Sequence, residues 1–199
     1  MKRPFIIKDK RILIVFLVSW ILFMFLMFKD NFGYISTSKT QTGEWTTVTH
    51  PLYGFSLEYP DKWRVEIFNE SGRKGAHEVK LLIRGREVGF SGIVIKLVQM
   101  KSPTVEDAAL WDDIRLTKLG KAAHSRGEAG YKQISLVEDE INGTPAIRRV
   151  YRLRDGQFEA VYIARANNFI IITLQTTQEY HDKYKEDFER VLESFRPLQ

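Results

Sequence analysis

The sequence contains no cysteine, which excludes several kinds of site and of stabilisation. Without thiols the chain has no disulfide, no lipid-modified N-terminal cysteine and no cysteine-containing zinc site. Alanine is also missing before Ala76, so the small-residue A-x-A site at which a signal peptide is commonly cleaved is absent. A folded domain of this chain must therefore be held together by its core alone.

Beyond its first eleven residues, the chain has almost no excess of positive or negative charge. The chain has 30 Lys and Arg against 25 Asp and Glu, a net charge of +5. Residues 1–11 hold five basic residues and one acidic residue, a net of +4, which leaves +1 for the rest (5 minus 4). A nearly neutral domain lacks the basic footprint of a nucleic-acid-binding protein, so we predict no nucleic-acid partner.

One long apolar run is present, and it begins at Ile12 and ends at Phe28 with Ser19 as its only polar side chain. At about 1.5 Å per residue, a helix of this length just crosses a ~30 Å hydrocarbon core. The basic residues precede the run, and the charges that follow it nearly cancel. The positive-inside rule therefore predicts a single-pass cell-membrane protein that contacts the bilayer through residues 12–28, with its N-terminus cytoplasmic and residues 29–199 extracytoplasmic.

A cleaved signal peptide is the alternative interpretation, since it also has a basic start and an apolar centre. The run is longer than the ~7 to 15 residues of a typical signal-peptide core, which favours an uncleaved anchor. The predicted organisation is a basic cytoplasmic segment at 1–11, a transmembrane helix at 12–28, a linker at 29–47 and one extracytoplasmic domain at 48–199.

Within the domain, alternating and apolar stretches predict strands at 55–59, 64–68, 78–83, 92–98, 131–140, 145–153, 157–166 and 169–176. A helix is expected from an N-cap at Ser102 to about Lys118, and a second one after a capping box formed by Thr176 and Glu179. Turn pairs at 142–143, 155–156 and 167–168 predict that the last four strands form an antiparallel meander.

We assign most of the large apolar residues to the predicted core. The stretch 169–172 is apolar on both faces, which suits a central strand covered on both sides. The last helix carries an apolar stripe expected to lie against the sheet, made of Tyr180, Tyr184, Phe188, Val191, Leu192 and Phe195. We interpret Trp63 as a core aromatic and Gly54 as the residue that permits a backbone turn.

Two sequence stretches resemble the PsbP-like family. The first runs from Tyr53 to Trp63 (YGFSLEYPDKW), with a Gly-Phe pair, an alternating strand, then Tyr-Pro and a Trp. The second is the ending, with a hairpin through 167–168, a helix opening near Tyr180, and a closing Phe188-x-x-Val191-Leu192-x-Ser194-Phe195. The similarity covers about residues 48–197. It implies an α+β fold in which helices flank an antiparallel β-sheet, in agreement with the pattern of elements.

For function, the resemblance implies a non-catalytic protein. Photosynthetic PsbP proteins are extrinsic subunits of the oxygen-evolving photosystem on its lumenal side, linked to retention of calcium and chloride. Relatives of the same fold serve as assembly factors, bacterial envelope proteins and a nuclear-transport accessory protein. This chain departs from the plant type because it keeps an apolar anchor and shows no transit peptide, so neither a photosystem role nor a metal ligand carries over.

A search for catalytic or metal-binding patterns returns little, and we predict no enzyme activity, no metal site and no cofactor. The four histidines show no H-x-x-x-H spacing. Two acidic clusters could offer oxygen ligands to Ca²⁺, one with Glu106, Asp107, Asp112 and Asp113 and one at 138–140. Neither has the spacing of an EF-hand loop, and a solvated helix face and a charged strand end are the favoured interpretation.

The candidate partner-binding residues are Arg148, Arg152 and Arg154, which share one face of a predicted strand while Arg149 and Tyr151 share the other. Guanidinium groups offer paired donors to carboxylates or phosphates of a partner or of lipid headgroups. Pairing with acids on neighbouring strands is the favoured alternative.

Two functions stay open at this point. The preferred one is a non-catalytic binding or assembly module, anchored in the membrane beside a membrane-protein complex or in the envelope. The other is an enzyme or small-molecule-binding domain with its site between sheet and helices. A deep pocket with convergent polar groups would favour the second, whereas a filled core and an exposed apolar or charged face would favour the first.

Overall fold

The computed structural model describes residues 39–42, 44–51, 53–68, 76–83 and 91–198. The predicted transmembrane segment at 12–28 and the loop expected after residue 68 lie outside these residues. Within them, no helix is both long and apolar enough to cross a membrane. The fold described below belongs to one compact unit, Thr37–Gln199.

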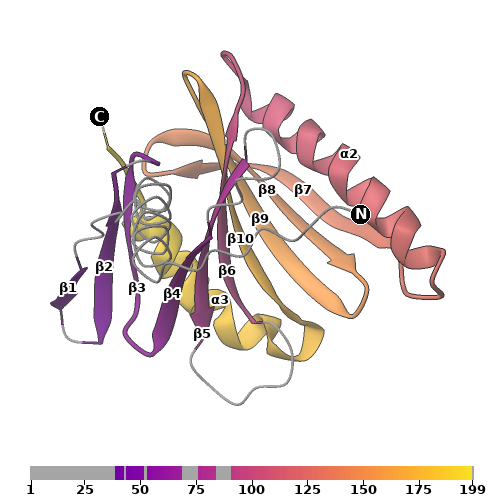
Figure 1. The fold of residues 1–199 in the computed structure, drawn as a ribbon, viewed down its shortest axis with the longest axis horizontal. Coiled ribbons are helices and arrows are strands. Elements are labelled where there is room, and N and C mark those ends of the chain that lie inside the picture. The colour runs from indigo at the N-terminus through magenta and orange to yellow at the C-terminus, as the bar shows by residue number, and fades with distance from the viewer. Residues whose placement is uncertain (1–38, 43, 52, 69–75, 84–90, 199) are drawn as a thin grey trace, which may run out of the picture. The chain divides into compact units, whose positions relative to one another are not determined.

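A small antiparallel sheet has the strand order β1-β2-β3-β11 (Figure 1). Its strands are β1 (Lys39–Thr42), β2 (Trp45–His50), β3 (Phe55–Pro60) and β11 (Arg196–Pro197). Strand β1 and the first three residues of β2 lie within the stretch expected to be a linker at 29–47. The difference has a physical reason, because Trp45 and Val48 are buried in the core and draw β2 into the fold.

The large sheet has seven antiparallel strands in the order β4-β5-β6-β10-β9-β8-β7. They are β4 (Trp63–Phe68), β5 (Ala76–Ile83), β6 (Gly92–Gln99), β7 (Tyr131–Ile141), β8 (Thr144–Leu153), β9 (Gly156–Arg165) and β10 (Asn168–Thr177). The predicted meander of the last four strands is confirmed, and β10 is indeed central. The mixed α+β fold with antiparallel sheets is therefore as predicted, although the second sheet was not foreseen.

The two helices of the described residues cover opposite faces of the large sheet (Figure 1). Helix α2 (Val105–His124) packs on β7, β8, β9 and β10, and α3 (Gln178–Ser194) packs on β3, β9 and β10. Successive residues of β10 serve the two faces, since Ile170 and Ile172 pack on the α3 side and Phe169 and Ile171 on the α2 side. The predicted core positions Trp63 and Phe188 are buried.

The helix starts differ from the predicted ones. Thr104, not Ser102, is the N-cap of α2, because its hydroxyl accepts from the N–H of Asp107 while the Asp107 carboxylate accepts from the N–H of Thr104. The helix continues to His124, six residues beyond the expected end. Helix α3 begins after Thr177, with no side-chain cap, so the capping box expected from Thr176 and Glu179 is wrong.

The hairpin turns follow the predicted chemistry only in part. Asn142 and Gly143 both have positive φ, and the Asn142 side chain also donates to the carbonyl oxygens of Leu192 and Phe195 at the end of α3. In the next turn the positive φ belongs to Arg154 and not to Gly156. Strand β8 therefore ends at Leu153, and Arg154 lies outside the strand on which it was expected.

Candidate functional site

Arg148 is the most heavily engaged of the three predicted partner-binding residues. It lies on the α3 side of the sheet, where its guanidinium donates to Asp139 of β7 at 2.7 Å, to Glu159 of β9 at 2.6 Å and to Glu189 of α3. Its side chain is only 18% exposed. The favoured alternative, pairing with acids on neighbouring strands, is confirmed for this residue. Arg148 therefore joins three strands and a helix from within the domain.

Glu159 is a buried carboxylate in this cluster. Burial alone would raise the pKa of Glu159, but His181 and Arg148 outweigh it and hold that pKa below its usual value. His181 is itself buried, with its Nε2 atom 3.4 Å from Glu159. The cluster thus places charged side chains inside the fold, and each of these charged groups is paired with another residue of the same domain.

Arg152 and Arg154 are exposed but also have neighbours of their own. The Nε atom of Arg152 donates to Gln157 at 3.4 Å, and that of Arg154 lies 2.8 Å from the carboxylate of Glu128. Arg148 and Arg152 point to the same face as predicted, whereas Arg154 sits in the turn. The three guanidinium groups do not form a continuous free basic row. Binding of a partner by Arg152 and Arg154 stays a prediction.

A second polar network, on the α2 side, was not foreseen from the sequence. Arg149 is buried and donates to the hydroxyl of Tyr162 and to the carbonyl of Ala109, while the Tyr162 hydroxyl donates to Asp112 at 2.8 Å. Asp112 also accepts from Arg115 at 2.7 Å. Burial, together with the nearby Asp112 charge, raises the pKa of Tyr162. The network ties α2 to β8 and β9.

The acidic residues of α2 consequently do not form one solvated face. Asp107 caps the helix, Asp112 is buried in the network, and Asp113 accepts from the hydroxyl of Tyr131 at 2.8 Å. Among the described residues, no group of three or more His, Asp or Glu side chains could hold a metal ion.

The described residues at the start of the first PsbP-like stretch have structural roles. Gly54 has a φ of +64°, as its predicted role in a turn requires, and the Arg165 guanidinium fills the space where a Cβ would stand. Arg165 donates to the carbonyl of Tyr53 at 2.7 Å. His50 stacks on the Tyr53 ring with 4.0 Å between ring centroids, and its side chain is fully buried.

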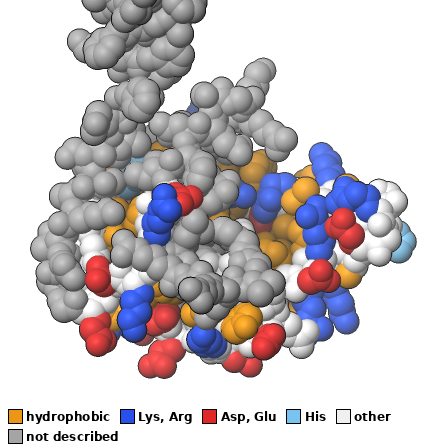
Figure 2. Space-filling model, turned by 60° about the horizontal axis from the view of Figure 1, so that its bottom comes forward, with side chains coloured by type: hydrophobic (Ala, Val, Ile, Leu, Met, Phe, Trp, Pro, Cys, Tyr) orange, Lys and Arg blue, Asp and Glu red, His pale blue; other side chains and the backbone are white. Residues whose placement is uncertain are grey.

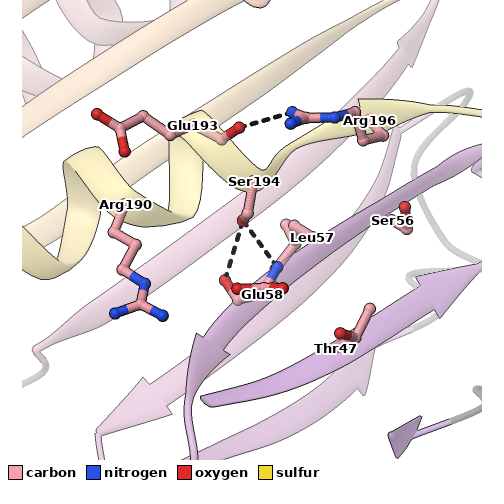
Figure 3. Close-up of a pocket in the computed structure, with 8 residues that line it drawn as sticks. All are labelled: Thr47, Ser56, Leu57, Glu58, Arg190, Glu193, Ser194 and Arg196. Atoms are coloured by element: carbon pink, nitrogen blue, oxygen red, sulfur yellow. Dashed lines mark hydrogen bonds between the residues drawn. The ribbon is translucent and has the colours of Figure 1, made fainter. Parts of the chain in front are cut away.

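An open hollow of about 410 Å³ lies between β3 and the end of α3, the region where an enzymatic site would be expected (Figure 3). Its lining consists mostly of polar side chains, namely Thr47, Ser56, Leu57, Glu58, Arg190, Glu193, Ser194 and Arg196. The Ser194 hydroxyl accepts from the N–H of Glu58 at 2.8 Å and donates to the Val191 carbonyl. Arg196 donates to the carbonyls of Glu193 and Phe195.

Two of the polar side chains around this hollow, those of Ser194 and Arg196, are therefore engaged by the chain's own backbone. Arg190 lies over the Trp45 ring, 4.0 Å from its centroid. The lining includes no histidine that could activate Ser194 as a nucleophile. The geometry is that of a strand-to-helix junction on the surface and lacks the arrangement that acyl transfer or hydrolysis requires.

Large apolar side chains are exposed at the outer edge of the large sheet. Five of them, between 45% and 60% exposed, define what we call the α2–β7 edge: Leu110, Ile114, Ile134, Leu136 and Val137. Leu136 is paired with Arg149, and Arg149 in turn binds the carbonyl of Ala109, so this strand edge and this part of the helix adjoin. Val137 is paired with Arg148 and so lies on the opposite face of the strand from Leu136. Exposed apolar residues along an edge of this kind commonly mark an interaction surface.

The charged side chains on the face drawn in Figure 2 are mixed in sign. Figure 2 shows Lys and Arg interspersed with Asp and Glu on the face that it presents, with apolar side chains between them. This distribution agrees with the near-neutral charge of the chain beyond residue 11 and gives that face no field of one sign.

Comparison with known proteins establishes the fold. No protein-family model matches the sequence, and a search of curated proteins finds no match. Among solved structures, the chain is similar to cyanobacterial PsbP from Synechocystis, with 17% identity over 81% of this chain and 97% of the other and a TM-score of 0.62. The domain therefore has a PsbP-like fold, as the two sequence stretches indicated.

Two other solved structures are similar at lower scores. One is a Pseudomonas aeruginosa protein of unknown function, with 17% identity over 82% of this chain and 98% of the other and a TM-score of 0.39. The other is a Bacteroides thetaiotaomicron protein, with 11% identity over 73% of this chain and 46% of the other and a TM-score of 0.41.

Proposed function

We propose that this chain is a non-catalytic binding or assembly module, anchored in the cell membrane by residues 12–28, whose extracytoplasmic domain binds a membrane-associated protein. The observation that carries the proposal is the α2–β7 edge on a domain whose core is filled. The two core clusters are built of large buried side chains, including Phe55, Phe169 and Phe188. The interior on both sides of the large sheet is thus taken up by the chain itself.

The charge step across residues 12–28 supports the anchor and its orientation. A net charge of +4 precedes the run, and the two charges that follow it directly, Lys29 and Asp30, cancel. The PsbP-like fold supports the non-catalytic role, since the fold in photosynthetic relatives serves attachment to a membrane complex. The lining of the hollow beside Ser194, where hydroxyl and guanidinium groups bind backbone atoms, supports it as well.

Site-specific photo-crosslinking in native membranes tests the proposal. A photoreactive amino acid is placed at Leu110 or Val137 of the full-length chain, and at Leu119 as a matched control, because Leu119 is an exposed apolar residue of the same helix outside the edge. We expect a discrete cross-linked protein product from Leu110 and Val137 and at most a trace from Leu119. No product from the edge, or equal products from all three sites, would refute it.

A further inference from the structure

We propose that the C-terminal end of α2 binds the anionic phospholipid headgroups of the membrane in which the chain is anchored. Four cationic side chains around this end define what we call the basic corner: Lys118, Lys121, Arg126 and Arg154. The inference goes beyond the proposed function and rests on it only for the anchor at residues 12–28. Three features carry it: positive charge that the fold does not neutralise, a hollow beside the cations, and a short tether to the membrane.

The first feature is the charge on the helix itself. Lys118 and Lys121 are exposed, and neither makes an ion pair within the described part of the chain. They lie three positions apart, where like charges repel each other across the helix surface. The helix dipole favours cations in the last turn, which accounts for Lys121 but not for Lys118. The stability of α2 therefore does not explain this pair of lysines.

The loop and turn next to the helix add to the excess. Glu128 is shared by two guanidinium groups, with the Nε atoms of Arg126 and Arg154 at 3.0 Å and 2.8 Å from its carboxylate. Even when Asp155 of the turn is counted, four cations stand against two carboxylates, a net charge of +2 (4 minus 2). The whole chain beyond residue 11 has a net charge of only +1. Its positive charge is thus concentrated at the basic corner.

Figure 2 shows the same concentration. The face that it presents is mixed in sign as a whole, but Lys and Arg side chains gather at the right-hand end of the view, where α2 ends. A local excess of this kind attracts an anionic surface over a distance of about 10 Å at 0.1 M salt.

The carbonyl groups at the end of α2 do not oppose this attraction. A helix C-terminus normally disfavours anions, because its last carbonyl oxygens carry partial negative charge. Here the N–H of Ser125 bonds to the carbonyl of Lys121, and the Ser125 hydroxyl donates to that of Ala122. The N–H of Gly127 bonds to the carbonyl of His124. The cationic side chains therefore dominate what this end presents to an anion.

The second feature is an open hollow of about 450 Å³ between the last turns of α2 and the start of β7. Its walls are mainly apolar, and Lys121 and His124 are among the residues that line it, together with Thr117, Ser125, Tyr131 and two glycines. Leu119, which is 38% exposed, precedes this part of the helix surface by one residue. Apolar surface bordered by lysine suits the boundary between headgroups and acyl chains.

The third feature is the length of chain between the predicted anchor and the domain. Ten residues, 29–38, separate Phe28 from β1, and fully extended they span at most ~36 Å. The domain therefore stays close to the bilayer, where a high effective concentration makes weak charge contacts sufficient. Figure 1 places β1 and the end of α2 on opposite sides of the domain. The tether and the basic corner would together hold the domain in one orientation.

Fluorescence quenching in vesicles tests the inference. Because the chain has no cysteine, a single cysteine carries a fluorescent label without background. Full-length chains with labelled Leu119→Cys are reconstituted in vesicles of phosphatidylcholine alone or of phosphatidylcholine with phosphatidylglycerol, each containing a lipid-attached quencher. We expect the ratio of quenched to unquenched label to be tenfold or more higher with phosphatidylglycerol. Labelled Glu140→Cys, an exposed site near the other end of β7, should show no difference.

Removal of charge tests the cause of the contact. In the labelled chain, the combined substitutions Lys118→Gln, Lys121→Gln and Arg126→Gln should lower the ratio with phosphatidylglycerol about tenfold or more, because each cation near an anionic surface contributes roughly fivefold. The wild-type ratio should also fall as salt is added, since salt screens exposed charge contacts.

A matched control removes as much charge elsewhere. The combined substitutions Lys62→Gln, Arg64→Gln and Lys101→Gln change exposed residues outside the basic corner. Arg64 is paired with a glutamate two positions further on, as Arg126 is, so the control also matches the ion pair that is lost. This variant should keep the wild-type ratio.

Equal quenching of the Leu119 label in both kinds of vesicle, or an equal loss in the two triple variants, would overturn the inference. The proposed function would then still stand if the α2–β7 edge cross-links to a protein. Lipid-dependent quenching without any cross-link from that edge would support the basic corner and refute the proposed protein binding alone.

Discussion

At the scale of single residues, the polar contacts predict that Arg148 contributes strongly to the stability of the domain. It neutralises carboxylates from β7, β9 and α3 in a largely buried position. Replacing Arg148 with Gln leaves the buried Glu159 without its main cationic partner, and removal of one partner of a buried ion pair costs about 3 to 5 kcal/mol. We expect the free energy of unfolding of the domain, measured by denaturant titration of residues 37–199, to fall by about that amount.

The matched control is Arg152→Gln, the same chemical change on the same strand face at a residue with one side-chain hydrogen bond where Arg148 has four. Because Arg152 is exposed and bonds only to Gln157 within the described residues, its loss should change stability by no more than about 0.5 kcal/mol. Equal effects of the two substitutions would show that Arg148 does not hold the elements together.

Glu159 predicts how stability depends on pH. Its folded-state pKa is lowered, so its contribution is present above the unfolded-state pKa and is lost as the pH falls through the folded-state value. The domain should therefore lose stability on the acid side. Glu159→Gln should be less stable than wild type at pH 7, and the difference should shrink as the pH falls below about 4. A difference that stays constant from pH 7 to pH 3 would contradict this assignment.

At the scale of elements, the strands were predictable because each carries its own pattern, such as the alternation of β3 and the continuous apolar run in β10. The polar networks were not, because they depend on which strands become neighbours. Arg149 and Asp112 are 37 positions apart in the sequence, and nothing local distinguishes them from solvated charges. Only the packing of α2 over β8 and β9 brings them to one cluster.

The helix ends show a similar limit. Ser102-Pro103 and Thr104-x-x-Asp107 are both plausible starts, and the choice depends on reciprocal hydrogen bonds that only the second pair can form. Ser102 instead adopts a positive φ, and its N–H bonds to the carbonyl of Ala166.

This difference gives an element-scale prediction. Thr104→Ala should destabilise the domain by about 1 kcal/mol, the usual cost of losing a cap, whereas Ser102→Ala should leave the start of α2 intact. Thermal unfolding followed by circular dichroism measures both variants. A larger loss from Ser102→Ala than from Thr104→Ala would place the cap at Ser102 after all.

At the scale of the whole molecule, the proposed topology makes a direct prediction. Protease added to intact cells should digest the domain beyond residue 29 and leave a short membrane fragment that contains residues 12–28, because the basic N-terminus is retained in the cytoplasm. Lysed cells supply the control in which both sides are accessible. Release of a soluble domain without protease would indicate a cleaved signal peptide, and full protection would indicate the opposite orientation.

The central proposal is that the α2–β7 edge is covered by protein in the membrane. Hydrogen–deuterium exchange of the full-length chain in native membranes tests it most directly, with a Leu136→Asp, Val137→Asp variant for comparison. We expect slow exchange along β7 in the wild type and faster exchange there in the variant, with exchange in the central strand β10 unchanged in both. Equally fast exchange along β7 in the wild type and the variant would show a bare edge and would contradict the proposed function.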